Sequence, residues 1–581
     1  MTEFFINLMP QLTILSNSLP MDIWSGSSKT AALSPALAAM AIAVAIFVIL
    51  ITHVLFCSAW AVRKRALSHL PTPPLNCCSV RHLLLGTFGL LPLEGLKDRH
   101  RGIARLQREA GPVLLLKLPC CRSKVVFSKG LPSEWAARGV DSERSAFRSM
   151  IPKSLLALPL NEEWQIHRRI IAPLFSSRAL DHHMPRVEAL TRSMVSLWVD
   201  ELEHLKQQLP SVLAAEETPP IELSAALKAW SLDMIGAIGF GHDFQCIQDL
   251  ATSPMSAGAA KTPFENRFFL ASEAILSEVL RRFRSPWPMY LCCCWKLRAY
   301  RRARAVYADV GVEIVLAKLE EDKQEETKKK KKKKKGGRST SIIEALLTAR
   351  DEGFSGKTLS TQDVLEETVS LLLAGHDTTS NSANWMLLLL ARNPAQQAKL
   401  RATINAGWDG VAPLTSASLQ EIGDGCLLTL VYETLRLFPT VPFTVKVSPR
   451  VWDAELGGSR CPIPAGQRFG VNKVLLGQDA TRFPSPTTFD AFRPLEQFGA
   501  RAKHIAAFGG GARVCVGYRL AELQLMAFAV VLLTTFEVRE PGRASAGGVA
   551  AAAPPAPQEF VDITNGPKHS GMWLTLVRLQ T

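Results

Sequence analysis

A glycine-rich loop that ends in a single cysteine is the feature that most restricts the fold of this 581-residue chain. The loop, residues 508–517, reads F-G-G-G-A-R-V-C-V-G, and a strongly apolar run of helical composition, residues 518–535, follows it. A helix over that run would direct the positive end of its dipole and its free N–H groups toward Cys515. Both effects favour a thiolate over a thiol. The sequence therefore predicts a cysteine held as an anion at a helix N-terminus.

The residues before Cys515 indicate what this sulfur binds. Three consecutive glycines, residues 509–511, let the backbone approach a large flat group because they carry no side chain. Arg513 adds a cation that can neutralise acidic groups on that partner. A thiolate that can bind iron axially, a backbone that can lie against a flat ring, and a guanidinium for acidic groups together suit a heme. A lone cysteine after a glycine turn is more often a small buried hydrophobe, so the heme hypothesis needs support from the rest of the chain.

The spacing of the loop residues resembles the heme-binding loop of the cytochrome P450 superfamily. That loop reads F-x-x-G-x-R-x-C-x-G, and Phe508, Gly511, Arg513, Cys515 and Gly517 fill every defined position. The resemblance implies heme b with Cys515 as the axial ligand of the iron. It implies Phe508 and Arg513 as further cofactor-binding residues. It also implies the fold class, which is mainly α with small peripheral β-sheets.

A long helix is predicted over residues 361–392. Ser360 and Asp363 have the spacing of a capping box, and Pro394 stops the helix at its other end. A helix of this length spans on the order of 48 Å. It is therefore expected to cross the whole molecule.

Inside that helix, residues 374–379 read A-G-H-D-T-T, similar to the A-G-x-D/E-T-T motif of cytochromes P450. The resemblance implies Asp377 and Thr378 as catalytic residues that bring protons to the distal side of the heme. A mid-helix glycine costs about 1 kcal/mol relative to alanine, and we expect Gly375 to make room for dioxygen. Taken alone, the motif would be a threonine-rich helix turn with an exposed acid.

Glu433 and Arg436 lie three residues apart on a predicted helix, in Y-E-T-L-R-L-F-P. Such pairs are usually solvated surface bridges, but the neighbours here are apolar, which predicts burial and further partners. The segment is similar to the E-x-x-R motif of cytochromes P450, which a later arginine completes. The resemblance implies Arg493 in that structural role, although Ala491 and Pro494 depart from the family's F-x-P-x-R-F pattern.

Two further sites are predicted for the heme propionates. Trp164 and Arg168 would share one helix face, and they match the family's W-x-x-x-R pattern, although Asn161 stands where glycine is more usual. A core tryptophan beside a surface arginine is the alternative interpretation. Lys446 stands where the family commonly has arginine. It would offer a propionate a positive charge, but without the planar pair of donors that an arginine guanidinium presents.

Residues 31–62 are predicted to form one transmembrane helix, because they carry no charged side chain and suffice to span a bilayer. A basic cluster, residues 63–65, follows at once, and the positive-inside bias places residues 1–30 on the non-cytosolic side. The run is too long and too far from Met1 for a cleaved signal peptide. A buried core helix is a poorer alternative. The endoplasmic reticulum is the usual address of the eukaryotic family members, and a plastid or mitochondrial membrane also fits.

A basic and proline-rich hinge, residues 63–75, is expected to join this helix to one large catalytic domain, residues 76–581. Two inserts interrupt that domain, a lysine-rich one at 328–337 and an Ala/Gly/Pro-rich one at 543–557. Eight consecutive lysines supply about half of the net charge of +15, so the basic balance does not indicate nucleic-acid binding. The lysine run contacts anionic lipid or is a tolerated low-complexity expansion.

The twelve cysteines contain no C-x-x-C spacing and suit neither a zinc site nor a disulfide framework. A reducing cytosol fits a chain whose functional thiolate must stay free. The segments expected to line the substrate space, near Trp164, at Ala374 and over residues 441–445, are largely apolar. They predict a small lipophilic, lipid-like substrate.

The resemblance as a whole implies a heme-thiolate monooxygenase that inserts one oxygen atom from O2 into that substrate. The chain has no flavin or nicotinamide motif, so electrons would come from an NADPH-dependent flavoprotein reductase or a cytochrome b-type donor. The donor is expected to dock near Cys515, where Arg501, Lys503 and Arg513 supply positive charge.

Two alternatives remain. One is a heme-thiolate isomerase or lyase of the same fold, which needs no dioxygen, and the other is a non-catalytic heme-binding membrane protein. The presence of both Asp377 and Thr378 argues against each of them.

Overall fold

The structure is a computed structural model, and every residue that it describes lies within Trp60–Thr581. The described residues are Gln107, 113–118, 122–127, 141–142, 145–148, 151–208, 220–252, 267–284, 294–328, 341–448, 450–456, 459–541, 559–561, 565–567 and 573–579. The predicted transmembrane helix, the hinge and the insert at 543–557 lie outside these residues, as does the lysine-rich insert after its first lysine.

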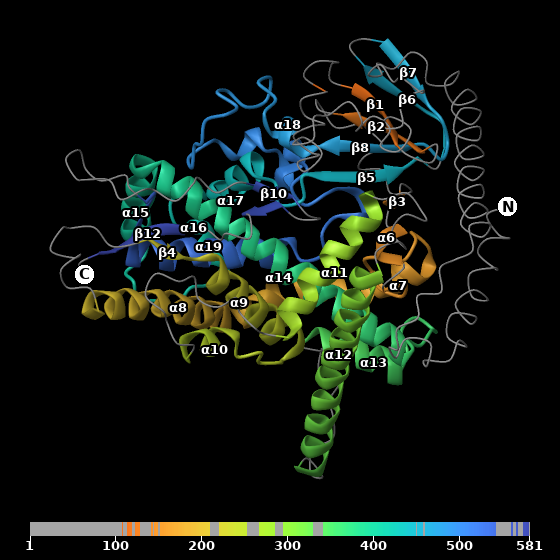
Figure 1. The fold of residues 1–581 in the computed structure, drawn as a ribbon, viewed down its shortest axis with the longest axis horizontal. Coiled ribbons are helices and arrows are strands. Elements are labelled where there is room, and N and C mark those ends of the chain that lie inside the picture. Colours follow the sequence, from red (N-terminus) through yellow and green to blue (C-terminus); the bar gives the residue numbers. More distant parts are fainter. Residues whose placement is uncertain are drawn as a thin grey trace, which may run out of the picture. The chain divides into compact units, whose positions relative to one another are not determined.

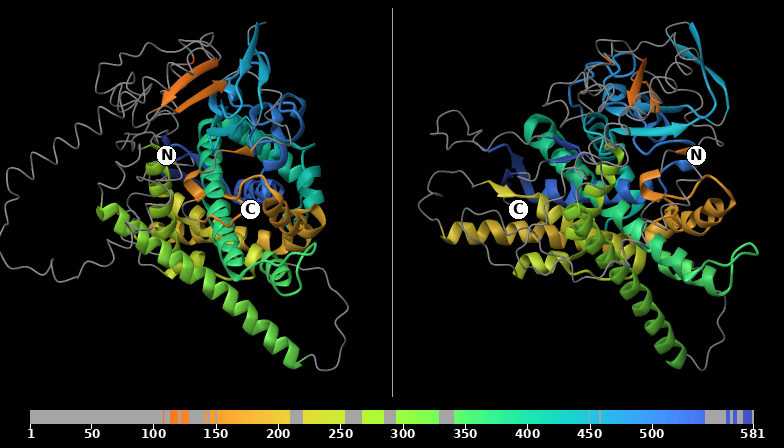
Figure 2. Two further views of the ribbon diagram at one scale, coloured as in Figure 1. Left: turned by 90° about the vertical axis from the view of Figure 1, so that its right-hand side faces the viewer. Right: turned by 45° about the vertical axis from the view of Figure 1, so that its right-hand side comes forward.

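Helices form most of the described structure, as the sequence predicted (Figure 1). In chain order they are α6 (Ser145–Arg148), α7 (Glu162–Ile171), α8 (Ser177–Gln208), α9 (Ser224–Ile235), α10 (Cys246–Thr252), α11 (Arg267–Arg284), α12 (Cys294–Lys328), α13 (Ile342–Asp351), α14 (Thr361–Arg392), α15 (Pro394–Gly407), α16 (Ser416–Glu421), α17 (Cys426–Leu437), α18 (Lys473–Gly477) and α19 (Tyr518–Thr535). Short 3₁₀ or π turns are η4 (Ala172–Phe175), η5 (Gly236–Phe240), η7 (Leu495–Gln497), η8 (Ala500–Ile505) and η9 (Gly511–Arg513). The second half of α12 extends beyond the helices on which its first half packs (Figure 2).

The strands form small sheets beside the helices. The largest sheet has the order β1-β2-β8-β5-β3, and a three-stranded sheet has the order β4-β12-β9. Two hairpin-like pairs, β6 with β7 and β10 with β11, complete the set. The strands are β1 (Val113–Leu118), β2 (Arg122–Phe127), β3 (Asp141–Ser142), β4 (Ile221–Glu222), β5 (Phe443–Val447), β6 (Trp452–Leu456), β7 (Ser459–Ile463), β8 (Arg468–Asn472), β9 (Phe536–Arg539), β10 (Glu559–Val561), β11 (Asn565–Pro567) and β12 (Trp573–Arg578).

Helix α14 has the bounds that the sequence predicted, and most of its residues are buried. At its start, the backbone N–H of Asp363 donates to the Ser360 hydroxyl at 3.1 Å, and the Ser360 N–H donates back to the Asp363 carboxylate at 2.7 Å. These two bonds are the predicted capping box. Pro394 begins α15 directly after α14 ends, at the first helical position, where a missing N–H costs nothing.

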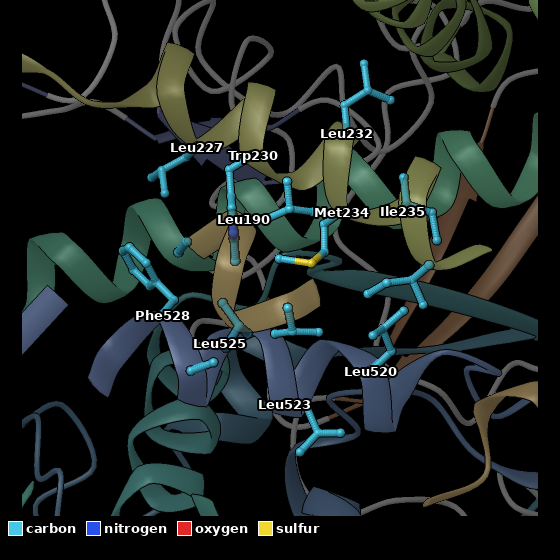
Figure 3. Close-up of a cluster of buried hydrophobic side chains, with 14 of the residues drawn as sticks. Leu190, Leu227, Trp230, Leu232, Met234, Ile235, Leu520, Leu523, Leu525 and Phe528 are labelled. Carbon is cyan, nitrogen blue, oxygen red and sulfur yellow. The ribbon is translucent and has the colours of Figure 1, made fainter. Parts of the chain in front are cut away.

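Helix α19 also has its predicted bounds, and it packs against α8, α14, α15 and α17. Its core contact with α9 is aromatic: the ring centroids of Trp230 and Phe528 lie 5.6 Å apart (Figure 3). Within the described residues, α19 is the one helix long and apolar enough to cross a membrane, and 67% of it is buried inside the protein. Such burial is typical of the core helix of a folded domain.

Candidate active site

The cysteine loop, residues 508–517, leads directly into α19. Gly509 and Gly511 have φ angles of +78° and +70°, in the left-handed region that suits glycine. The backbone N–H of Cys515 donates to the carbonyl oxygen of Phe508 at 2.9 Å and closes the loop. Cys515 is exposed, so its sulfur is accessible to a ligand. An exposed thiol does not fit the alternative of a small buried hydrophobe.

Helix α7 carries the first predicted propionate site. The side chain of Asn161 caps this helix by accepting the backbone N–H of Trp164 at 3.0 Å, which gives a physical reason for asparagine where the family more often has glycine. Trp164 is buried, and its indole N–H has no hydrogen-bond partner among the described residues. A buried donor without an acceptor is costly, and a propionate oxygen would satisfy it.

Arg168 lies one helical turn after Trp164 on α7. Burial lowers the pKa of its guanidinium, and the charge of Cys515 acts in the opposite direction. The two side chains are therefore close enough to interact. No carboxylate within the described segments forms an ion pair with Arg168. A half-buried cation without a protein counter-ion fits a cofactor that carries carboxylates.

Arg513, within the cysteine loop, is buried and packs over Trp164, with its guanidinium carbon 4.6 Å from the ring centroid. It donates to the carbonyl oxygen of Leu155 at 3.0 Å and to that of Leu158. A buried arginine cannot lie on a docking surface, so its predicted contact with an electron donor was wrong. Lys503 is exposed and remains a candidate for that contact, and the placement of the Arg501 side chain lies outside the described structure.

Lys446 is buried on β5, and its ammonium group donates to the carbonyl oxygen of Gly510 in the cysteine loop at 2.9 Å. A second buried lysine, Lys473, donates to Ala507 just before that loop at 3.4 Å. Two cations therefore contact the backbone around the loop from the side of the large sheet. Of these two lysines, only Lys446 was predicted from the sequence.

The predicted catalytic residues of α14 lie on a part of the helix that is less buried than the rest. Ala374 is exposed and Thr378 is half-buried, although most of the helix is buried. Neighbouring side chains therefore leave this face of α14 uncovered. The Thr378 hydroxyl donates to the carbonyl oxygen of Ala374 at 2.8 Å, and its oxygen can still accept a hydrogen bond.

Asp377 is half-buried, and Asn381 donates to its carboxylate at 3.3 Å. Its charge also reaches α12. Burial, together with the charge of Asp377, raises the pKa of the buried Tyr307 phenol, and a hydrogen bond with Ser272 opposes that effect. The structure thus places the carboxylate within electrostatic range of a buried hydroxyl pair formed by α11 and α12.

Gly375 has a different purpose from the one we expected. A Cβ atom at this position would lie 2.9 Å from Cγ1 of Ile235 on α9, closer than carbon atoms approach. The glycine is therefore required by the close packing of α14 on α9. The expectation that it makes room for dioxygen was wrong, because Ile235 fills that space.

Glu433, Arg436 and Arg493 form one buried cluster. Glu433 pairs with Arg436 at 2.6 Å and with Arg493 at 3.0 Å. The remaining N–H groups of the two guanidiniums donate to backbone carbonyl oxygens, including those of Gly477 and Pro484. The cluster ties α17 to the segment that precedes η7, despite the two departures from the family pattern.

A family model described as cytochrome P450 matches residues 81–546. The chain belongs to the cytochrome P450 family. It is 24% identical to cytochrome P450 4F8 of Homo sapiens over 407 residues, which are 67% of this chain and 70% of the relative. It is 25% identical to cytochrome P450 monooxygenase 128 of Postia placenta over 403 residues, 64% of this chain and 69% of the relative. A shorter match, 36% over 188 residues, covers 32% of this chain and 36% of the mitochondrial 25-hydroxyvitamin D-1 alpha hydroxylase of Mus musculus.

The cofactor of this cytochrome P450 is heme b with an axial cysteine thiolate, and its general activity is that of a heme-thiolate monooxygenase. The described residues fit this cofactor. An exposed cysteine, an indole N–H without a partner and a half-buried arginine lie around one loop. These groups match an iron ligand and donors for acidic substituents.

Sequence reasoning missed one polar cluster in this cytochrome P450. Glu367 on α14 is fully buried, and a carboxylate oxygen lies 2.6 Å from Nδ1 of His167 on α7. The available signal was the helix period: Trp164, His167 and Ile171 are all buried and share a face of α7. A polar residue on such a face requires a partner from another element.

Proposed function

We propose that this cytochrome P450 inserts one oxygen atom from O2 into a small apolar, lipid-like substrate, with Cys515 as the iron ligand. The observation that supports this assignment is the cysteine loop. Its thiol is exposed, its backbone is closed by the bond from Cys515 to Phe508, and a helix N-terminus follows directly. Bound heme supplies the activation of dioxygen, which no side chain of the protein can provide.

Four side chains are proposed to hold the propionates. Trp164 offers a buried N–H, and Arg168 offers a cation without a protein counter-ion. Lys446 and Arg513 add charge at the cysteine loop, where backbone carbonyl oxygens already orient both groups. Phe508 packs near Tyr432, with ring centroids 6.4 Å apart, and so gives the loop an apolar support.

Asp377 and Thr378 are proposed to bring protons to the distal side. Thr378 lies on the accessible face of α14, and its hydroxyl oxygen can accept a hydrogen bond from water. Asp377 is held by Asn381 on the same helix, at a position where it can take protons from outside the site and pass them inward.

The substrate and the partners follow from the same features. The exposed side chain of Ala374 offers an apolar wall, which suits a lipophilic molecule. Two relatives are named as a monooxygenase and a hydroxylase, in agreement with oxygen insertion. Electrons are proposed to come from an NADPH-dependent flavoprotein reductase or a cytochrome b-type donor, which docks where Lys503 is exposed. Residues 31–62 are proposed to anchor the protein in the endoplasmic reticulum membrane, with the catalytic domain in the cytosol.

The first experiment is the ferrous carbonyl spectrum of the purified full-length protein. We expect a thiolate-type Soret band for the wild type, its loss in Cys515→Ala, and its retention in the matched control Cys426→Ala, whose thiol is buried in the core. A histidine-type band in the wild type, or an unchanged band in Cys515→Ala, would contradict the proposal.

The second experiment measures NADPH and O2 consumption with a reductase and a panel of lipids. Turnover should require NADPH, and Thr378→Ala or Asp377→Asn should reduce product formation by about a hundredfold, a typical contribution of a proton-transfer group. Turnover without NADPH would instead indicate an isomerase or lyase. The absence of oxygen consumption with every lipid would indicate a non-catalytic heme protein.

A further inference from the structure

Glu367 joins three parts of the molecule that are distant in sequence. Besides its contact with His167, its carboxylate accepts the backbone N–H of Leu155 at 2.6 Å. The hydroxyl of Ser370, one turn further along α14, donates to it at 3.3 Å. All of these groups are buried. One side chain of α14 therefore holds both α7 and the segment that precedes it.

The backbone carbonyl group of Leu155 is hydrogen-bonded to the cysteine loop. Its carbonyl oxygen accepts a hydrogen bond from Arg513 at 3.0 Å, and the carbonyl oxygen of Leu158 accepts a second one. Arg513 in turn packs over the ring of Trp164. A continuous series of hydrogen bonds thus runs from Glu367 on α14, through Leu155, to the arginine two residues before Cys515.

The contact with His167 strengthens this connection. Burial raises the pKa of Glu367, and the hydrogen bond and charge of His167 oppose that effect. Burial by itself would lower the pKa of His167, but the hydrogen bond to Glu367, with the charges of Asp363 and Glu163, raises it overall. A hydrogen-bonded pair in a buried site holds its partners strongly because neither member can turn to water instead.

We propose that Glu367 is a positioning residue for the heme-binding loop, which it reaches through Leu155 and Arg513 and, by way of His167, through the helix that carries Arg168. The inference rests on the proposed binding of heme at Cys515. In this arrangement the distal helix fixes the proximal loop: a shift of Glu367 moves the carbonyl group that orients Arg513. Heme retention and thiolate ligation then depend on a residue that touches neither.

The adjacent Glu366 provides a matched control. It is also buried on α14, and it accepts the backbone N–H of Lys153 at 2.6 Å, two residues before Leu155. It also accepts a hydrogen bond from Gln362 on its own helix. The two glutamates therefore bind the same segment, but only the bonds of Glu367 lead to Arg513.

The test compares Glu367→Gln with Glu366→Gln in the full-length holoprotein. Two quantities are measured: the rate of heme transfer to excess apomyoglobin, and the fraction of the ferrous carbonyl that keeps the thiolate-type band. Loss of a hydrogen bond in this buried site should accelerate heme loss on the order of tenfold in Glu367→Gln, with a larger histidine-type or thiol-type fraction. Glu366→Gln should stay within about twofold of the wild type. Equal behaviour of the two variants would overturn the proposal.

A double-mutant cycle with Arg513→Lys tests the route of the effect. Lysine lacks the fork that binds two carbonyl oxygens, so this variant should lose heme faster by itself. In its background, Glu367→Gln should add less than about twofold, because the connection is already broken. If the fold-changes in heme loss of the two single variants multiply in full, Glu367 acts by another route and the inference is refuted.

A replacement variant and the wild-type spectrum separate failure of the positioning role from failure of the proposed function. Glu367→Asp takes the place of Glu367→Gln if the latter does not accumulate as a heme protein while Glu366→Gln does. Aspartate keeps the carboxyl group but withdraws it by one methylene, and its heme loss is compared with that of Glu366→Gln in the same way. A wild type without a thiolate-type band would refute the proposed function itself. A normal wild-type band with unchanged heme loss in the Glu367 variants would refute only the positioning role.

Discussion

Replacing Glu433 by glutamine is the perturbation whose cost the structure defines best. The two carboxylate oxygens of Glu433 accept hydrogen bonds from Arg436 Nε at 2.7 Å, from Arg436 Nη2 at 2.6 Å, from Arg493 Nε at 3.0 Å and from the backbone N–H of Asp490 at 3.0 Å. Glu433 and Arg436 are completely buried, and Arg493 nearly so. Among the residues that the structure describes, this glutamate is the carboxylate that the two guanidiniums share.

Glutamine keeps one acceptor oxygen and replaces the other with an NH2 group that faces donors. At least two of the four hydrogen bonds lose their acceptor, and a hydrogen bond to a charged group contributes about 1.5–3 kcal/mol. Removing one partner of a buried ion pair costs roughly 3–5 kcal/mol by a separate line of measurement. The first figure gives a loss of about 3–6 kcal/mol and the second about 3–5 kcal/mol, which is a fifth or more of the roughly 5–15 kcal/mol that stabilises a typical domain.

Urea unfolding of the full-length protein in detergent, followed by circular dichroism and by Soret absorbance, measures this loss. The matched control is Glu537→Gln, because Glu537 pairs with Arg539 at 2.8 Å while their side chains stay 28% and 45% exposed. We expect the control to change the free energy of unfolding by no more than about 1 kcal/mol. A Glu433→Gln protein that unfolds within about 1 kcal/mol of the wild type would refute the reasoning, since it would mean that the buried guanidiniums need no carboxylate.

Three other predictions follow from particular contacts. Gly375→Ala should destabilise the fold by about 1–3 kcal/mol through overpacking against Ile235, and in thermal unfolding its cost should be smaller in an Ile235→Ala background than in the wild type; full stability of the single variant would contradict the packing argument. His167 has a pKa raised from 6.5, so it stabilises the fold fully below that pH and loses this contribution as the pH rises through the raised value. The difference in free energy of unfolding between wild type and His167→Gln should therefore shrink above about pH 6.5. A difference that grows with pH would contradict a stabilising role of protonated His167. In heme-free protein, iodoacetamide should label the exposed Cys515 before Cys426, because burial raises the pKa of Cys426 to about 11. Mass spectrometry of the labelled peptides checks this order, and added heme should protect Cys515.

Local signals predicted the elements that carry the site. The capping box at Ser360 and Asp363 and the proline after the helix end gave α14 its bounds, since both act within a few residues of the helix ends. The same holds for α19, which follows directly after the cysteine loop. For Glu433, the apolar neighbours indicated burial, and the structure brings it together with Arg436 and Arg493. Which side chains bind heme and transfer protons stays a prediction.

Other features depended on contacts between distant parts of the chain. Gly375 looked like a residue that makes room for a ligand, but the neighbour that requires it is Ile235 on another helix. Arg513 looked available for a docking partner, yet it is buried and donates hydrogen bonds to the carbonyl oxygens of Leu155 and Leu158. No spacing within a single segment reports such contacts.

The sequence by itself determined the family, the cofactor chemistry and the ends of the two principal helices, because motif spacing, caps and turn-forming glycines act over short stretches of chain. Only the tertiary structure decided which groups are buried and what each of them faces. The contact between Glu367 and His167 joins residues 200 positions apart, and its strength comes from the exclusion of water by packing around both. Burial of that kind is a property of the whole fold, since it requires α7, α14 and the segment before α7 to meet at one place.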